Sequence, residues 1–317
     1  MKKFLTIFGI VIAVLLVILC IAGNYMCSYA LLPGEHGDDF EGDRAKTEGR
    51  YPGIMAWYDS LRAIGSIRDT SLIGEGGYKL YAFFSDAQHP ESAEGTAVVV
   101  HGYTDNHICF LNLVRMYRDS LNYNVMVPDL HFHGLSEGRA VQMGWLDRLD
   151  VKRFGELAHN IWGQDFMVVH GVSMGAATTM MLSGDELPDY YKAFVEDCGY
   201  SSVWDQFAHN LKDSFGLPTF PILDCASIAC KMRYGWGFKE ASSVAQLAKC
   251  TRPMLFIHGN ADDFVVFENL QKNYDAKVNG YKEMWVAEGS EHAMAYRDHP
   301  AEYVAHVRAF LKTVKEL

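Results

Sequence analysis

Short apolar runs alternate along this chain with longer segments of helical periodicity. The runs that we expect to form strands span residues 66–73, 78–84, 96–101, 124–128, 166–170, 193–197, 254–258 and 282–286. The segments that we expect to form helices span residues 51–63, 111–119, 151–162, 174–182, 269–277 and 301–314. The first two strands alternate apolar and polar positions, as in a hairpin, whereas the 96–101 run is apolar without alternation, as in a sheet covered on both faces. The pattern predicts an α/β fold with a doubly wound, mostly parallel sheet.

The N-terminus carries a different pattern. Residues 4–22 are a 19-residue apolar run without charge, which as a helix would span roughly 28 Å, about the thickness of a bilayer core. Lys2 and Lys3 precede the run, so we expect a transmembrane anchor at residues 1–30 with the rest of the chain outside the cytoplasm. The alternative is a signal peptide cleaved after Ala30, which would give a secreted protein. Residues 31–50 are polar and glycine-rich, which predicts a linker.

The remaining residues, 51–317, suit one large domain with an insertion. About 55 residues separate two of the expected strands, and this segment, residues 198–251, is rich in aromatic residues. A gap of that length favours a small helical cap inserted into the domain. The net charge is −11 and basic residues form no stripe, so nucleic-acid binding is not expected.

Seven cysteines are scattered through the chain without a C-x-x-C pair, so the sequence does not support a zinc site. Cys198, Cys225, Cys230 and Cys250 fall in one region. They are either buried apolar residues or partners in disulfides, which an exported domain would allow. No cofactor motif appears, and the pattern predicts no oligomeric state.

The turn Gly171-Val-Ser173-Met-Gly175 lies between an expected strand and an expected helix. Glycine tolerates strained backbone and close contacts, so this turn would hold the Ser173 hydroxyl above the edge of the sheet. Such a turn is the nucleophile elbow of serine hydrolases, although an ordinary strand-to-helix turn could share the sequence.

An acid and a histidine follow Ser173 at the ends of later strands. Asp262 comes after the 254–258 strand and His292 after the 282–286 strand. The order serine, acid, histidine is the one that hydrolases of this kind require for a nucleophile, an orienting acid and a base. The neighbouring Asp263 competes with Asp262 for the role of the acid, but the spacing from Gly259 favours Asp262.

Together these motifs give the chain a resemblance to the serine α/β-hydrolases over about residues 70–315. In particular, it resembles the serine aminopeptidase-like (Hydrolase_4) group, which includes membrane-anchored bacterial hydrolases. The motifs are His101-Gly-Tyr103, Asp129-x-His-x-His133-Gly-x-Ser136, Gly171-x-Ser173-x-Gly175, Gly259-x-x-Asp262-x-x-Val265 and Gly289-x-x-His292.

The resemblance implies an alpha/beta-hydrolase fold in which Ser173 is the nucleophile, Asp262 the acid and His292 the base. It also implies that the backbone N–H groups of Tyr103 and Met174 bind the oxyanion. The chain departs from many relatives at His131, where they carry arginine.

These features favour a serine hydrolase that cleaves carboxylic esters of a small-molecule or peptide acyl substrate through an acyl-enzyme. A peptidase or amidase with the same three residues and an acyltransferase are the alternatives, and a non-catalytic binding module is a third. His101 and His258 are expected to tie loop backbones together, and His133 to bond within its own loop. Asp147, Arg148 and Asp150 are expected to form a solvated or ion-paired patch.

Overall fold

The computed structural model describes residues 2–34 and 36–317, which form two compact units. Residues 2–34 pack with Ser202–Ser242, and we call this part the helical unit. Residues 36–201 pack with Ser243–Leu317, and we call this part the sheet unit. The compact part of the insertion is therefore shorter than the expected cap of residues 198–251.

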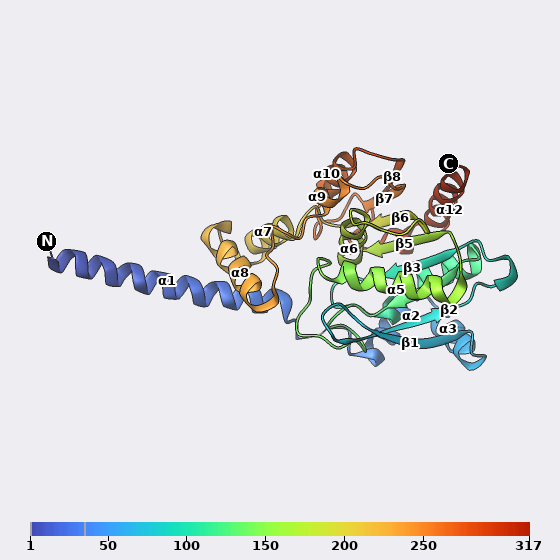
Figure 1. The fold of residues 1–317 in the computed structure, drawn as a ribbon, viewed down its shortest axis with the longest axis horizontal. Coiled ribbons are helices and arrows are strands. Elements are labelled where there is room, and N and C mark those ends of the chain that lie inside the picture. Colours follow the sequence, from blue (N-terminus) through green and yellow to red (C-terminus); the bar gives the residue numbers. More distant parts are fainter. Residues whose placement is uncertain (1, 35) are drawn as a thin grey trace. The chain divides into compact units, whose positions relative to one another are not determined.

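The sheet unit contains an eight-stranded sheet of order β1-β2-β4-β3-β5-β6-β7-β8 (Figure 1). The strands are β1 (Ile67–Ile73), β2 (Lys79–Ser85), β3 (Thr96–Val100), β4 (Asn124–Pro128), β5 (Met167–Val172), β6 (Tyr191–Asp197), β7 (Met254–Gly259) and β8 (Lys282–Ala287). β2 pairs antiparallel with both β1 and β4, and all pairs from β4 to β8 are parallel. The predicted doubly wound, mostly parallel sheet is confirmed.

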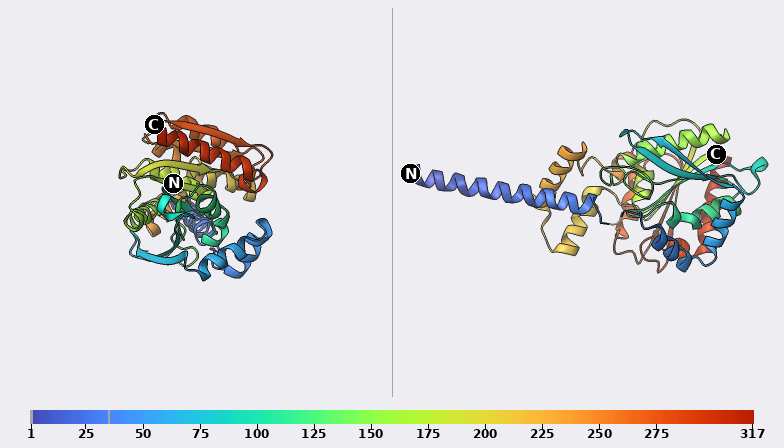
Figure 2. Two further views of the ribbon diagram at one scale, coloured as in Figure 1. Left: turned by 90° about the vertical axis from the view of Figure 1, so that its right-hand side faces the viewer. Right: turned by 90° about the horizontal axis from the view of Figure 1, so that it is seen from below.

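Helices cover both faces of this sheet (Figure 2). The helices of the sheet unit are α2 (Phe40–Arg50), α3 (Ile54–Ala63), α4 (Leu111–Arg115), α5 (Asp147–Trp162), α6 (Met174–Ser183), α9 (Ser243–Leu247), α10 (Glu268–Ala276), α11 (Ala295–Asp298) and α12 (Pro300–Glu316), with short turns η1 (Pro90–Ser92), η2 (His107–Phe110) and η3 (Met116–Ser120). α3, α4 and α12 share one hydrophobic core with the sheet, and α5, α6 and α10 pack against its strands. Every residue of β3, β4 and β5 is buried as a result, which explains their lack of alternation.

A chain of buried hydrogen bonds crosses the layer between the sheet and α12. The Tyr303 hydroxyl donates to Oδ2 of Asp197 (2.9 Å), so it accepts from Nε2 of His170 (2.8 Å). Nδ1 of His170 then accepts from the Tyr117 hydroxyl at 2.9 Å. Burial lowers the pKa of His170 to about 3, so the imidazole is neutral, as this pattern requires. The network fixes β5, β6 and α12 relative to one another.

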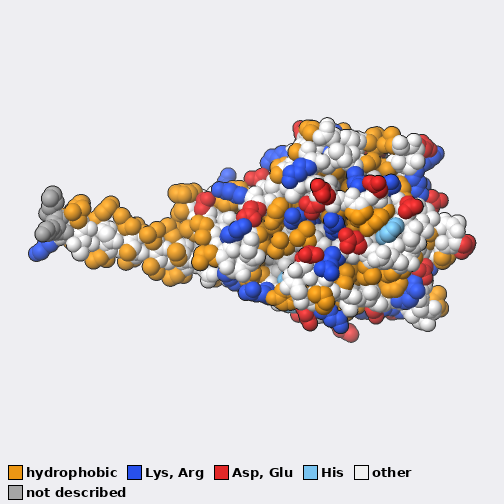
Figure 3. Space-filling model, in the orientation of Figure 1, with side chains coloured by type: hydrophobic (Ala, Val, Ile, Leu, Met, Phe, Trp, Pro, Cys, Tyr) orange, Lys and Arg blue, Asp and Glu red, His pale blue; other side chains and the backbone are white. Residues whose placement is uncertain are grey.

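The helical unit consists of α1 (Lys2–Leu31), α7 (Val203–Phe215) and α8 (Thr219–Tyr234). Residues 3–31 of α1 are long and apolar enough to cross a membrane, a property that signal sequences share. Apolar side chains cover the visible face of α1 (Figure 3). Aromatic residues of the insertion pack with one another: the Phe207 and Phe238 rings lie 4.8 Å apart, and Trp236 and Phe238 are both buried.

The polar segment expected to be a linker contains helix α2. Asp39 caps this helix by accepting a hydrogen bond from the Gly42 N–H (3.0 Å). Asn106 Nδ2 donates to the Gly37 carbonyl oxygen and to Asp43 Oδ2, both at 2.7 Å. Residues 37–50 are therefore part of the sheet unit. Their polar groups cap helix α2 and form hydrogen bonds with Asn106.

The expected ion-paired patch at the start of α5 is partly wrong. Arg148 pairs with Asp185 at 3.0 Å, but Asp147 and Asp150 are buried. Asp147 Oδ2 accepts from the Gly144 N–H (2.8 Å), whereas its Oδ1 has no hydrogen-bond partner among the described residues. Burial raises the pKa of Asp147 to about 8 and outweighs the hydrogen bond from Gly144.

Asp147→Asn should therefore stabilise the protein more at pH 8.5 than at pH 5.5. The folded-state pKa of about 8 lies above the usual 3.8, so the stability from protonated Asp147 is fully present below pH 3.8 and is lost as pH rises from 3.8 to 8. The loss is about 1.4 kcal/mol per pH unit within that window. Thermal midpoints of the two proteins at both pH values measure the difference. Asp165→Asn, which removes an exposed carboxylate, controls for net charge; an equal effect of Asp147→Asn at both pH values would contradict the prediction.

Candidate active site

Ser173 lies at the sharp turn between β5 and α6. Its backbone has φ 57° and ψ −118°, which is strained for a residue with a side chain. A Cβ at Gly171 would lie 2.0 Å from the Gly175 carbonyl oxygen, and one at Gly175 would lie 2.1 Å from the Val100 carbonyl oxygen. Only glycine fits at these two positions, so they impose the tight turn that the sequence predicts.

Two hydrogen bonds bring Ser173, His292 and Asp262 together in one line. Ser173 Oγ lies 2.8 Å from His292 Nε2, and His292 Nδ1 lies 2.7 Å from Asp262 Oδ2. An ionised carboxylate only accepts hydrogen bonds, so Asp262 holds the imidazole proton on Nδ1. The lone pair of Nε2 then faces the Ser173 hydroxyl and can accept its proton. The three residues come from three loops far apart in the sequence.

Asp262 is held in place through both of its carboxylate oxygens. Oδ1 accepts from the N–H groups of Phe264 (3.0 Å) and Val265 (2.9 Å). Oδ2 faces His292 and also lies 3.1 Å from His258 Nε2. Burial would raise the pKa of Asp262, but the hydrogen bonds and charges of the two histidines hold it at about 2. Asp262 is therefore an anion at neutral pH, while the competing Asp263 is exposed.

The residues predicted to bind an oxyanion lie beside Ser173. Met174 is the first residue of α6, where backbone N–H groups have no partner within the helix. Gly102 touches the serine: a Cβ there would lie 3.6 Å from the Ser173 Cβ. Tyr103 follows Gly102 in the same turn, and the turn is held by the Thr104 N–H, which donates to His133 Nε2 (3.2 Å).

Buried histidines hold the loops around the site. His101 Nε2 accepts from the Leu130 N–H at 2.8 Å, and His258 Nε2 lies 2.8 Å from the Val265 carbonyl oxygen. Both therefore link loop backbones, as expected. His133 bonds to the His131 carbonyl oxygen (3.0 Å) within its own loop, but it also reaches Thr104, a link that the sequence did not indicate. Nε2 of His131 accepts from the Arg139 N–H at 3.1 Å.

Sequence reasoning missed two residues at the end of β6. The Asp197 carbonyl oxygen accepts from the Ser173 N–H at 2.8 Å, and burial raises the pKa of its carboxyl to about 6. Cys198 follows with a positive φ of 53°, and Ser173 and Ala293 share this backbone strain. A carboxylate at a strand end was the available signal, but Asp197 precedes the insertion and was assigned only to a strand.

Cys198, Asp262 and His292 place potential metal-ligand atoms within 4.8 Å of one another. His292 already shares a hydrogen bond with Asp262 and another with Ser173, so both of its ring nitrogens are occupied. Burial raises the pKa of the Cys198 thiol well above its usual value, which disfavours the thiolate that a metal would need. The arrangement suits proton transfer from a serine better than metal binding.

Comparison with known proteins identifies the family of this chain. The model of the prolyl oligopeptidase family matches residues 155–316. The uncharacterized protein YqkD of Bacillus subtilis is 30% identical over 228 residues, covering 72% of this chain and 74% of that protein. The matching family differs from the serine aminopeptidase-like group that the motifs resembled, although both have the alpha/beta-hydrolase fold.

Solved structures share the fold at low sequence identity. The Pyrococcus furiosus esterase Pf2001 has a TM-score of 0.64 and 20% identity, covering 80% of this chain and 95% of that one. The acylaminoacyl peptidase of Pyrococcus horikoshii has a TM-score of 0.58 and 14% identity, covering 78% of this chain and 41% of that one. The chain thus has the alpha/beta-hydrolase fold and belongs to the prolyl oligopeptidase family.

Proposed function

We propose that this chain is a serine esterase in which Ser173 attacks the carbonyl carbon of a carboxylic ester. The observation that carries the proposal is the continuous line of hydrogen bonds from Ser173 Oγ through His292 to Asp262 (2.8 and 2.7 Å). A serine hydroxyl is a weak nucleophile until a base takes its proton, and His292 lies in the position of that base.

In the acylation step, Nε2 of His292 takes the Ser173 proton while Oγ bonds to the carbonyl carbon. The imidazolium that forms is stabilised by Asp262, which stays ionised because its pKa is about 2. His292 then gives the proton to the leaving alcohol, and the acyl group remains on Ser173.

The negative charge that develops on the carbonyl oxygen needs donors beside Ser173. The N–H groups of Met174 and Tyr103 are the proposed donors, because one begins a helix and the other belongs to the turn that touches the serine. In the deacylation step, water enters, gives its proton to His292 and releases the acid by the same route.

An ester substrate is the proposal, and an amide or peptide substrate is the alternative. The similarity to the P. furiosus esterase covers 95% of that chain, whereas the similarity to the acylaminoacyl peptidase covers 41% of it. The matching family is nevertheless one of peptidases, which supports the alternative. An acyltransferase would use the same acyl-enzyme with an alcohol in place of water.

We also propose that α1 is a retained membrane anchor with the sheet unit outside the cytoplasm. Lys2 and Lys3 precede the apolar run, which favours a cytoplasmic N-terminus. Cys27 and Leu31 are fully buried within the helical unit. Cleavage after Ala30 would remove Cys27 and leave Leu31 at a new N-terminus without its helix, which favours a helix that is kept.

Ser173→Ala should lower kcat for p-nitrophenyl acetate by about 10⁴-fold or more, because no other residue supplies the nucleophile. Labelling by a fluorophosphonate probe, followed by mass spectrometry of the modified peptide, tests the same residue directly. Ser136→Ala, a change in the neighbouring 129–138 loop, should keep the labelling. Retained hydrolysis in Ser173→Ala, or a probe attached elsewhere, would refute the proposal.

Asp262→Asn should lower kcat by about 10⁴-fold, whereas Asp263→Asn should remain close to the wild type. Asparagine preserves the acceptor for the N–H groups of Phe264 and Val265 but no longer favours the proton on His292 Nδ1. Kinetics of both variants with one ester, and their thermal midpoints as a check on folding, decide between the two aspartates. A larger loss in Asp263→Asn would reassign the acid.

The wild-type protein should hydrolyse p-nitrophenyl esters faster than matched aminoacyl p-nitroanilides. Esters have better leaving groups and also hydrolyse faster without an enzyme. The ratio of the ester rate to the anilide rate is therefore measured for this protein and compared with the same ratio for spontaneous hydrolysis. A panel of acyl chain lengths then defines the pocket. A ratio of ester rate to anilide rate below the spontaneous ratio would support the peptidase alternative. Product formed only with an added alcohol would indicate an acyltransferase.

A further inference from the structure

We propose that Cys27 of α1 and Cys230 of α8 form a disulfide bond that ties the N-terminal helix to the inserted helices. Both residues belong to the helical unit and have no exposed surface. Their thiols are free in the structure and lie close enough to interact with each other. The pair lies outside the proposed catalytic residues, and its disulfide would be a covalent modification.

The helix backbones come very close where these cysteines meet. A Cβ at Gly23 would lie 2.5 Å from the Cys225 Cβ and 2.6 Å from its backbone carbonyl carbon. Gly23 and Cys27 are one helical turn apart on the buried face of α1. Ala226 and Cys230 are likewise one turn apart on the buried face of α8. Small residues at this contact allow the approach that a disulfide needs, with Cα atoms about 4.4–6.8 Å apart.

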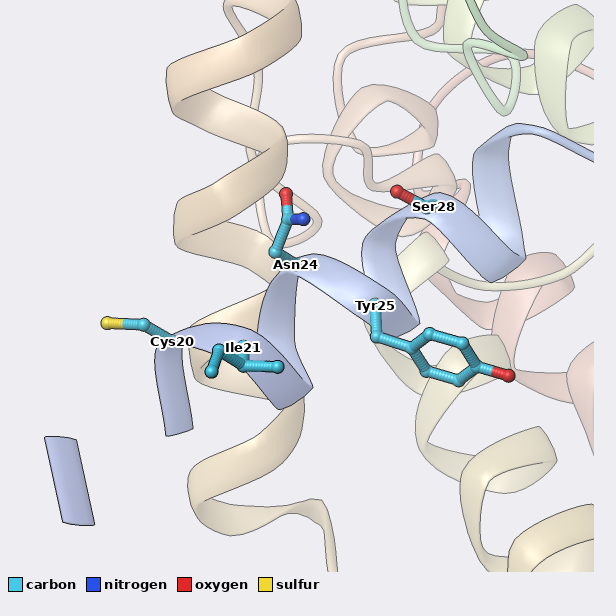
Figure 4. A pocket seen from close by; sticks show the side chains of 5 residues that line it. All are labelled: Cys20, Ile21, Asn24, Tyr25 and Ser28. Atoms are coloured by element: carbon cyan, nitrogen blue, oxygen red, sulfur yellow. The ribbon is translucent and has the colours of Figure 1, made fainter. Parts of the chain in front are cut away.

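Polar contacts fix the relative position of the two helices along their axes. Arg233 Nη1 donates to Ser28 Oγ at 2.7 Å and to Asn24 Oδ1 at 3.1 Å. Asn24 and Ser28 lie on the same side of α1, where they help to line an open hollow with Cys20, Ile21 and Tyr25 (Figure 4). Because these bonds restrain sliding, Cys27 stays opposite Cys230.

Cys27 lies five residues beyond Ala22, the last residue of the uncharged apolar run. At about 1.5 Å per helical residue it is about 7–8 Å past the end of the run. With the proposed orientation of α1, this places the pair on the exported side of the membrane, where disulfides persist. This step rests on the proposed localisation and does not depend on the proposed esterase activity.

The bond requires an oxidant, and a protein or small-molecule disulfide of the exported compartment supplies it. The thiolate of one cysteine attacks that disulfide, forms a mixed disulfide and releases one thiol. The second cysteine displaces the other sulfur as a second thiol. The Cys27 and Cys230 thiols thus lose two electrons and two protons, which the oxidant gains as it becomes two thiols.

The test counts thiols in the full-length protein in its membranes. Free thiols are blocked with N-ethylmaleimide, the protein is denatured and reduced, and a polyethylene glycol maleimide then labels the newly released thiols. The wild type should gain two labels, and non-reducing mass spectrometry should identify the Cys27–Cys230 peptide pair. Cys27→Ser and Cys230→Ser should gain none. Cys225→Ser, on the same helix, should still gain two.

A wild type without newly released thiols, or one whose linked peptides contain other cysteines, would overturn the proposal. A nearby competitor is a pair between Cys20 and Cys225, and Cys225→Ser would then lose both labels. The peptide identification in the wild type decides the matter even if a serine variant accumulates poorly. Ester hydrolysis measured on the same membranes shows separately whether the proposed catalytic function holds.

Two glycines of α1 supply a matched pair of variants. Gly23→Leu should lower the cross-linked fraction several-fold, because the side chain would force α1 and α8 apart at Cys225. Gly9→Leu adds the same side chain where nothing lies within 4 Å, so the cross-linked fraction should not change. Equal cross-linking in both variants would show that the α1–α8 contact does not set the pairing.

Discussion

The close contact between the Ser173 turn and β3 is the constraint on which the rest of the site depends. A Cβ on Gly175 would lie 2.1 Å from the Val100 carbonyl oxygen and 2.6 Å from the His101 carbonyl oxygen, which is too close for any side chain. The chain can therefore turn from β5 into α6 only with strained backbone at Ser173. The Ser173 N–H is then directed to the Asp197 carbonyl oxygen at the end of β6. This turn thereby contacts the ends of the neighbouring strands β3, β5 and β6, and the loop after β3 lies beside the serine.

Acids at this edge of the sheet share a buried environment but differ in the direction of their pKa shifts. Asp262 accepts two backbone N–H groups. It also faces two histidines, whose hydrogen bonds and charges outweigh burial and keep its pKa at about 2. Asp197 accepts one tyrosine hydroxyl through its carboxylate, and burial dominates, so its pKa is raised to about 6. Among the described residues the Glu196 carboxyl accepts only the Gly199 N–H, and burial raises its pKa well above the usual value. The hydrogen bonds and opposite charges at each carboxyl, set against its burial, determine which acid is charged and so able to orient a histidine.

The sequence predicts the parts of this protein in which periodicity and chain order carry the information. Ser173, Asp262 and His292 could be proposed because each follows a recognisable strand, and parallel strands end at one edge of a sheet. The contact of His258 with Asp262 and the role of Asp197 could not, because these contacts depend on which side chains meet across loops. Helix α2 was missed for a related reason: its polar composition resembles a linker, and only the capping by Asp39 and the bonds of Asn106 show that it belongs to the sheet unit.

Helix α1 shows how one element can satisfy two environments. From Phe4 to Ala22 it is apolar without charge, which gives no reason for one face to differ from another. From Gly23 the buried positions recur every four residues at Gly23, Cys27 and Leu31, which is the spacing of a helix packed against a single partner. That change from uniform exposure to periodic burial lies beyond the apolar run, where α1 packs against α8. A signal peptide needs no such packing face, so the periodicity of residues 23–31 supports the proposal that α1 is kept in the folded protein.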